Sequence, residues 1–174
     1  LVVMQIEQLY EVAGPRLRHV KLHGALYHQV SADAALAEAV AGDIARLWPN
    51  LVLFALAGSN LAKAGRAVGL NVAEEVFADR TYRSDGTLTP RSQPGALIVD
   101  EEAAVAQVLR MVRQGIVGAT DGMDRPIRAD TVCLHGDGRS AVAFARRLRR
   151  ELAAAGVAIK PFAAGWDADA RCES

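Results

Sequence analysis

The sequence predicts a parallel α/β fold, either an open sheet or a barrel. Short, continuous apolar runs recur along the chain, as is typical of strands buried on both faces, and residues 51–56 form the clearest of them. Stretches of helical length follow most of these runs, and they are long enough for the crossovers that parallel pairing requires. Of the 174 residues, 51% are hydrophobic and 23% are charged, which favours a single globular domain with a sizeable core.

Charge and cysteine content narrow the function classes. The formal net charge is zero, so no global field would attract nucleic acid or an anionic membrane. The apolar runs are too short to span a bilayer, and Cys133 and Cys172 give neither a disulfide framework nor paired metal-ligand spacing. We therefore expect a cytoplasmic protein whose partners are small molecules or other proteins.

The first half of the chain is expected to alternate helices and strands. Apolar residues at helical spacing, glycine and proline as helix stops, and short apolar runs give the bounds. Either Ser31 or Asp33 is expected to cap the second helix, because both side chains accept hydrogen bonds from free backbone N–H groups. The predicted elements are helix 1–12, strand 18–22, a helix from Ser31 or Asp33 to about Trp48, strand 51–56, helix 61–68 and strand 71–77.

The second half begins with a long loop, residues 79–95, which is rich in turn formers and charges. Loops of this length within a compact domain are usually functional. Asp100 is expected to cap the helix that follows, with acidic residues in the first turn. The predicted elements are helix 101–113, a small hairpin within 116–128, strand 131–134, helix 140–154, strand 157–162 and a loose tail 163–174, all in one domain.

Polar residues follow the predicted strands, where parallel α/β folds collect their functional groups. Lys21 and His23 share one face at the end of the first strand, since side chains alternate along a strand. An ammonium and an imidazole together suit proton transfer near neutral pH. The alternative is a solvated lysine and a packed histidine. Further polar residues lie at or just beyond the C-terminal ends of the later strands: Ser59, Glu74, Glu75, Asp79, Arg80, His135 and Asp137.

Several charged groups in this region each have a second interpretation. Glu74 and Glu75 point to opposite faces of their strand, so only one of them can enter a site as a base or as an orienting carboxylate. Asp79 and Arg80 form either part of the site or a surface ion pair. The loop segment with Arg91 and Gln93 offers a guanidinium and an amide for a substrate carboxylate or phosphate, or it is an exposed turn.

Three other patterns are weaker. Residues 136–141 fit Gly-x-Gly-x-x-Ala, but no complete βαβ unit follows, which leaves only a helix N-terminus able to receive an anion beside His135. No Walker sequence occurs, so any ATP is held by other means or by another subunit, and no set of His, Asp and Glu has the spacing of a self-contained metal site. The arginines at 146–150 are expected to form a solvated helix face.

Five stretches taken together resemble the LamB/YcsF family. They run in order along nearly the whole chain to about Ile159: Lys21-Leu22-His23-Gly24-Ala25-Leu26-Tyr27, Leu53-Phe54-Ala55-Leu56-Ala57-Gly58-Ser59, Val72-Ala73-Glu74-Glu75-Val76-Phe77-Ala78-Asp79-Arg80-Thr81-Tyr82, Pro90-Arg91-Ser92-Gln93-Pro94-Gly95-Ala96 and Val132-Cys133-Leu134-His135-Gly136-Asp137. The resemblance implies an incomplete parallel (β/α) barrel similar to the polysaccharide-deacetylase type. It implies the role of the A subunit in the ATP-dependent cleavage of 5-oxo-L-proline to L-glutamate.

The resemblance also implies partners and a co-substrate, and we add a hypothesis for the roles of the residues. ATP is the implied co-substrate, 5-oxoprolinase subunits B and C are the implied partners, and the use of a metal stays open. Lys21 and His135 would stabilise developing charge, while His23 with Glu75 or Asp79 would move protons. The residues implied in substrate binding are Tyr27, Ser59, Arg80, Arg91, Gln93 and Asp137, with Arg91 on the substrate carboxylate.

The chain departs from the family pattern in one respect. The family's Asn-Cys-Asp-x-Gly-Glu, Cys-Gly-x-His-Ala-Gly-Asp and Gly-Ala-His-Pro motifs do not occur in it. We therefore expect the C-terminal part of the family fold, without its first strands, and with exposed edges that favour self-association or marginal stability. Two other functions stay open: a metal-dependent carbohydrate amide deacetylase with the same fold, and a non-catalytic docking subunit.

Overall fold

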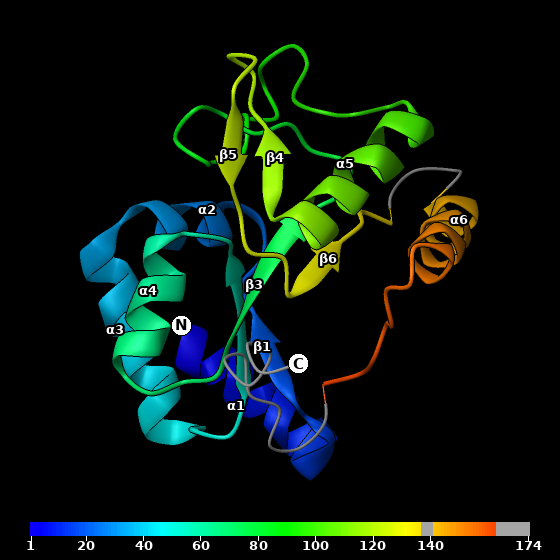
Figure 1. Cartoon of the computed structure of the whole chain (residues 1–174). Helices are drawn as coiled ribbons and strands as arrows, with labels where there is room; N and C mark the ends of the chain where they lie inside the picture. Colours follow the sequence, from blue (N-terminus) through cyan, green and yellow to red (C-terminus); the bar gives the residue numbers. More distant parts are fainter. Residues whose placement is uncertain (137–140, 163–174) are drawn as a thin grey trace. The chain divides into compact units, whose positions relative to one another are not determined.

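The computed structural model describes residues 1–136 and 141–162. Four strands, β1 (His19–Lys21), β2 (Val52–Leu56), β3 (Val72–Phe77) and β6 (Thr131–Cys133), form one sheet in the order β1-β2-β3-β6 (Figure 1). The chain divides into two compact units within β3. The N-terminal unit contains Leu1–Glu74 together with Phe162, and the C-terminal unit contains Glu75–Pro161.

The N-terminal unit contains the strands β1 and β2 and most of the helices. The two strands pair in parallel, with His19 opposite Val52, and all five residues of β2 are buried, as its uninterrupted apolar run predicted. Phe162 returns to this unit and packs on Phe54, with ring centroids 4.8 Å apart. The helical elements are α1 (Val2–Ala13), a 3₁₀ turn (Gly14–Arg16), α2 (Gly24–Ala32), α3 (Ala34–Leu47) and α4 (Asn60–Ala67), and α3 packs beside α4.

Two helices, α2 and α3, lie between the first two strands, and only the second was predicted. Asp33 lies between α2 and α3 with extended backbone angles and caps α3, since its carboxylate accepts a hydrogen bond from the N–H of Leu36 at 3.0 Å. The alternative cap, Ser31, is inside α2, where its hydroxyl donates to the carbonyl of Tyr27. The missed helix α2 begins at Gly24, whose φ of 60° is a conformation that favours glycine.

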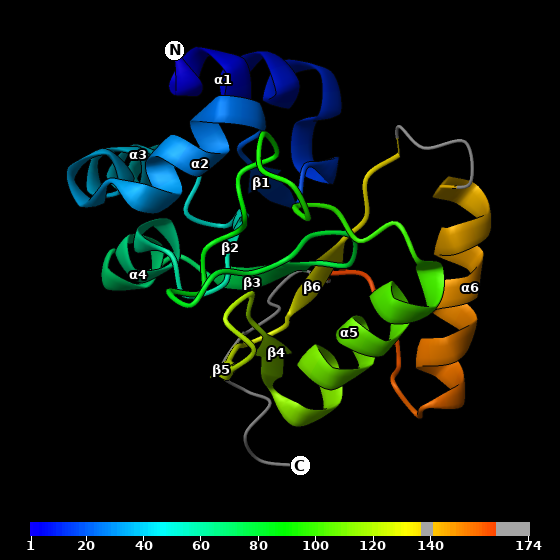
Figure 2. The same cartoon turned by 90° about the horizontal axis from the view of Figure 1, so that it is seen from above.

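The C-terminal unit contains the second half of β3, a long loop 78–99, and the remaining elements. These are α5 (Glu101–Gln114), the antiparallel strands β4 (Ile116–Gly118) and β5 (Asp124–Pro126), β6 and α6 (Ala141–Ala154). The predicted Asp100 cap, the hairpin and the long loop are all confirmed. Figure 2 shows α5 beside α6, in agreement with the contacts between the two helices.

The predicted last strand, 157–162, is wrong. Its residues are mostly exposed and have no regular secondary structure, and Pro161 has no N–H to donate to a sheet. The predicted tail 163–174 lies outside the described residues, and the single-domain interpretation stays a prediction. No helix in the part of the chain that the structure describes is long and apolar enough to cross a membrane.

Candidate functional site

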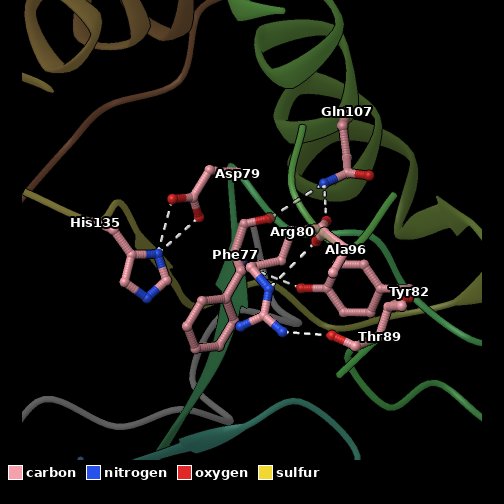
Figure 3. Close-up of polar contacts among 8 residues, drawn as sticks. All are labelled: Phe77, Asp79, Arg80, Tyr82, Thr89, Ala96, Gln107 and His135. Atoms are coloured by element: carbon pink, nitrogen blue, oxygen red, sulfur yellow. Dashed lines mark hydrogen bonds and ion pairs between the residues drawn. The ribbon is translucent and has the colours of Figure 1, made fainter. Parts of the chain in front are cut away.

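The central feature of the C-terminal unit is the pairing of Asp79 with His135. The Nδ1 atom of His135 lies 2.9 and 2.8 Å from the two carboxylate oxygens of Asp79 (Figure 3). Both side chains are mostly buried, with 20% of the Asp79 surface and 26% of the His135 surface exposed. The imidazole is therefore fixed by a carboxylate while part of it stays accessible to a substrate.

Strand register brings these two residues together although 56 positions separate them in the sequence. Strands β3 and β6 are parallel neighbours, with Phe77 opposite Cys133. Asp79 and His135 each lie two residues beyond that pair, and the N–H of Ala78 donates to the carbonyl of Cys133 at 3.0 Å. The ring of Phe77 stacks on that of His135 with centroids 5.8 Å apart, so the imidazole has an apolar wall.

This geometry suits general acid-base chemistry. An ionised carboxylate only accepts hydrogen bonds, so the Nδ1 atom of His135 must carry the proton that Asp79 accepts. In the neutral imidazole, Nε2 then presents a lone pair that can take a proton, and Asp79 stabilises the imidazolium that forms. Sequence reasoning named both residues but did not pair them, because it had combined Asp79 with His23.

Arg80 is buried rather than at the surface. Its side chain is 1% exposed, and its guanidinium donates to the backbone carbonyls of Thr89 at 2.5 Å and Ala96 at 3.4 Å. Burial, followed by the nearby Arg91 guanidinium, lowers the pKa of Arg80. The prediction of a surface ion pair between Asp79 and Arg80 is therefore wrong. Asp79 bonds His135, and Arg80 joins segments of the loop by donating to the carbonyls of Thr89 and Ala96.

Tyr82 anchors the same loop from inside the unit. Its side chain is fully buried, and its hydroxyl accepts a hydrogen bond from the N–H of Phe77 at 2.8 Å. Burial raises the pKa of Tyr82 above its ordinary value, and the nearby Glu75 carboxylate raises it further. A neutral phenol at this position holds the end of β3, the strand that leads to Asp79.

Gln107 of α5 completes the support of the pair. Its amide Nε2 donates to the carbonyls of Phe77 at 3.2 Å and Arg80 at 3.0 Å (Figure 3). Neither Gln107 nor Tyr82 was singled out from the sequence. A signal was present for Gln107, because it is a polar residue beside the buried positions Ala104, Val108 and Met111 of an amphipathic helix.

The other predicted residues of the C-terminal unit have different settings. Arg91 and Gln93 are exposed in the long loop, and the Arg91 guanidinium is close enough to Arg80 to affect its pKa. Glu75 is 2% exposed and acts electrostatically on Tyr82. Asp137 lies outside the described residues.

Glu74 belongs to the N-terminal unit and has a structural role there. Its carboxylate accepts a hydrogen bond from the N–H of Gly58 at 2.7 Å and pairs with Arg66 at 2.7 Å. Both carboxylate oxygens of Glu74 therefore have partners within this unit, and which of the two glutamates enters a site stays a prediction.

The remaining predicted residues follow β1 and β2 in the N-terminal unit. Lys21 is the last residue of β1, and its ammonium lies 5.7 Å from the ring centroid of the buried Tyr27. This is a cation–π distance, which orders the lysine side chain. His23 is exposed and is the N-terminal flanking residue of α2. Ser59 caps α4, since its hydroxyl oxygen accepts from the N–H of Ala62 at 3.2 Å.

The donor set around the pair is small. Within the described ranges 1–136 and 141–162, no group of three or more His, Cys, Asp and Glu side chains could hold a metal ion. Asp79 and His135 are two donors, and they bond each other. What this geometry supports by itself is the transfer of a proton at the free ring nitrogen.

Comparison with known proteins places the chain in a family. The LamB/YcsF family model matches residues 1–166. The chain is 51% identical over 162 residues to the 5-oxoprolinase A subunit of Bacillus subtilis, covering 91% of this chain and 63% of that protein. It is 54% identical over 169 residues to the 5-oxoprolinase A subunit of Methylococcus capsulatus, covering 95% and 65% respectively.

A solved structure shows the same fold. The lactam utilization protein of Thermus thermophilus has 39% sequence identity and a TM-score of 0.78, with 90% of this chain and 62% of that chain covered. This likeness, with the parallel order of the strands, confirms the predicted fold class of an incomplete parallel (β/α) barrel. The chain spans less than two thirds of the length of these relatives. It belongs to the LamB/YcsF family.

Proposed function

We propose that this chain contributes to the A subunit of an ATP-dependent 5-oxoprolinase, which cleaves 5-oxo-L-proline to L-glutamate with ATP hydrolysis. The names of the relatives support the assignment, and 5-oxoproline is a lactam, the class of compound for which the solved neighbour is named. The observation that carries the proposal is the Asp79–His135 pair, because opening a lactam ring requires a base for water.

An unactivated lactam reacts slowly with water, since its carbonyl carbon is a poor electrophile. Attack of the lactam oxygen on the γ-phosphorus of ATP releases ADP and activates the ring carbon. Water then adds to that carbon and gives up a proton, the C–N bond breaks, and the nitrogen takes a proton to become the amine of glutamate. A second water releases phosphate from the remaining acyl phosphate, so two waters and one ATP are used for each ring.

His135 is the base in this proposal. Its Nε2 atom takes the proton of the attacking water, and Asp79 holds the ring and stabilises the imidazolium. This role replaces the charge-stabilising one that the sequence suggested for His135. Lys21 keeps its proposed role beside developing negative charge, and Arg91 keeps its role on the substrate carboxylate.

The other predicted residues are given different roles according to their burial and hydrogen bonds. Arg80 is proposed to position the loop rather than to touch substrate, because its guanidinium already donates to two backbone carbonyls. Glu75 is buried, so it is proposed to act on the neighbouring Tyr82 rather than to touch substrate. Substrate contacts of Tyr27, Ser59, Gln93 and Asp137, and proton transfer by His23, are kept as part of the proposal.

ATP is proposed to be held with the help of other subunits. The sequence has no Walker motif, and 5-oxoprolinase subunits B and C are the partners that the family resemblance implies. The relatives are named as one lettered subunit of 5-oxoprolinase, which indicates an assembly with further subunits. The cytoplasm, where ATP is present, is the proposed location.

The proposal is tested by measuring glutamate formed from 5-oxoproline. The assay uses a protein of the length of the relatives that includes this sequence, together with subunits B and C, with and without ATP. We expect glutamate and ADP to form together only in the complete mixture. Glutamate formation without ATP would overturn the proposal. Acetate release from an acetylated sugar, dependent on added zinc, would instead identify a deacetylase.

A further inference from the structure

Gln107 contacts the backbone on both sides of Asp79. One amide nitrogen donates to the carbonyl of Phe77 at 3.2 Å and to the carbonyl of Arg80 at 3.0 Å. A glutamine NH₂ group has two hydrogens, so a single side chain serves both acceptors. The two carbonyls bracket Ala78 and Asp79, the residues where the chain leaves β3.

These two bonds tie α5 to the turn that aims the carboxylate. The backbone of the turn is also held at Ala78, whose N–H donates to Cys133, and at Asp79, whose carbonyl accepts from Ile98 at 3.0 Å. Those bonds link the turn to β6 and to the end of the loop. Gln107 also bonds the turn to α5, so the turn is held by β6, by the end of the loop and by this helix.

The contact between Asp79 and His135 is sensitive to such a support. Both carboxylate oxygens lie within 2.9 Å of Nδ1, so the carboxylate faces the ring nearly symmetrically. A shift of about 1 Å takes an oxygen out of hydrogen-bonding range, and misplacement of that size costs an enzyme on the order of a hundredfold in rate. The pair therefore depends on where the backbone of Asp79 is held.

We infer that Gln107 is a positioning residue, which holds the turn at Ala78 and Asp79 so that the Asp79 carboxylate fixes the His135 ring with the proton on Nδ1. The expected loss of activity rests on the proposed function, whereas the state of the ring does not. The two readouts can therefore fail separately.

The test replaces the amide by groups that cannot donate. Gln107→Glu has the same size but offers acceptors to two carbonyls, and Gln107→Leu removes the donor without adding charge. Gln114→Glu is the matched control, because Gln114 is the exposed last residue of the same helix. The proton position on His135 is read from imidazole ¹⁵N chemical shifts in a protein of the length of the relatives that includes this sequence, with the signal assigned by comparison with His135→Gln.

We expect wild type and Gln114→Glu to show the Nδ1–H form of His135, and both Gln107 variants to show a mixture of the two tautomers. In the complete enzyme, kcat should fall on the order of tenfold to a hundredfold, with KM for 5-oxoproline nearly unchanged. An unchanged tautomer in a folded Gln107 variant would overturn the inference. Loss of the helical circular dichroism signal in both variants would also overturn it, by making Gln107 a residue of general stability.

A changed tautomer with unchanged turnover would have a different meaning. It would keep Gln107 as the residue that positions the pair, and it would remove the pair from the proposed reaction.

Discussion

The imidazole of His135 and the carboxylate of Asp79 meet because β3 and β6 are paired with Phe77 opposite Cys133, and each residue lies two positions beyond that pair. The contact is made by both carboxylate oxygens, at 2.8 and 2.9 Å from Nδ1. Such an arrangement holds one ring nitrogen and leaves the other for chemistry. The proposed proton transfer therefore depends on the carboxylate as much as on the imidazole.

Replacing the carboxylate should slow turnover without weakening substrate binding. In Asp79→Asn the amide can donate to Nδ1 instead of accepting from it, which stabilises the wrong tautomer of His135. We expect kcat to fall by roughly 10²- to 10⁴-fold, with KM for 5-oxoproline nearly unchanged. Asp43→Asn is the control, since Asp43 forms an exposed ion pair with Arg46. Equal kcat values for the two variants would argue against the role of Asp79.

Lys21 is predicted to act on developing negative charge. It ends β1, and its ammonium is ordered over the ring of Tyr27. Lys21→Met keeps the aliphatic stem but removes the charge, so we expect turnover of the complete enzyme to drop at least about a hundredfold. Lys63→Met, at an exposed position of α4, should leave turnover unchanged. If the two variants retain the same turnover, Lys21 has no catalytic role.

The buried phenol of Tyr82 should make stability fall at high pH. Burial raises its pKa above the ordinary value of about 10, so the unfolded state loses this proton first. Its contribution to the free energy of unfolding is complete below pH 10 or so and decreases above it, by up to about 1.4 kcal/mol per pH unit. Urea unfolding between neutral pH and about pH 11 measures the slope.

Tyr82→Phe should remove this contribution to the slope. It should also lower stability at neutral pH by about 1–3 kcal/mol, because the N–H of Phe77 loses its acceptor. Tyr10→Phe, at a partly exposed residue of α1, is the control and should behave as wild type. A slope in Tyr82→Phe as steep as that of wild type would contradict the assignment.

Two glycines in helices should respond in opposite directions to the same substitution. A Cβ atom on Gly65 of α4 would lie 2.8 Å from side-chain atoms of Leu53 and of Val72, so Gly65→Ala overpacks the helix against the sheet. We expect a loss of about 1–3 kcal/mol. Gly42 of α3 has open space, and Gly42→Ala should stabilise by roughly 0.5–1 kcal/mol through helix propensity. Thermal unfolding of both variants measures these changes in stability, and stabilisation by Gly65→Ala would contradict the predicted overpacking of α4 against the sheet.

Much of the fold could be predicted from the sequence because local signals agreed with it. The apolar run of β2, the Asp33 and Asp100 caps and the turn between β4 and β5 all depend on neighbouring residues. The wrong predictions concern segments whose structure is not given by local sequence signals. The helix α2 was missed because it begins at Gly24, and glycine is a poor helix former, while 157–162 was predicted as a strand although it forms no regular secondary structure.

The candidate site was predicted as a set of residues but not as a geometry. Topology placed Asp79 and His135 after parallel strands, yet only the register of β3 with β6 determined that they face each other. Arg80 was expected to bind substrate as part of the set that accompanied the family resemblance, and its burial against backbone carbonyls has no signature in one sequence. Gln107 was missed because its partners lie on a distant segment of the chain, although a polar residue beside buried positions of its helix was a signal in the sequence.

The proposed chemistry depends above all on His135 as the base that opens the lactam ring. His135→Gln keeps a side chain of similar length but cannot take a proton, and it should be compared with wild type in the complete enzyme with ATP and 5-oxoproline. We predict that the rate of glutamate formation falls at least about a hundredfold while the circular dichroism spectrum is unchanged. Near-normal glutamate formation by a folded His135→Gln enzyme would contradict this role.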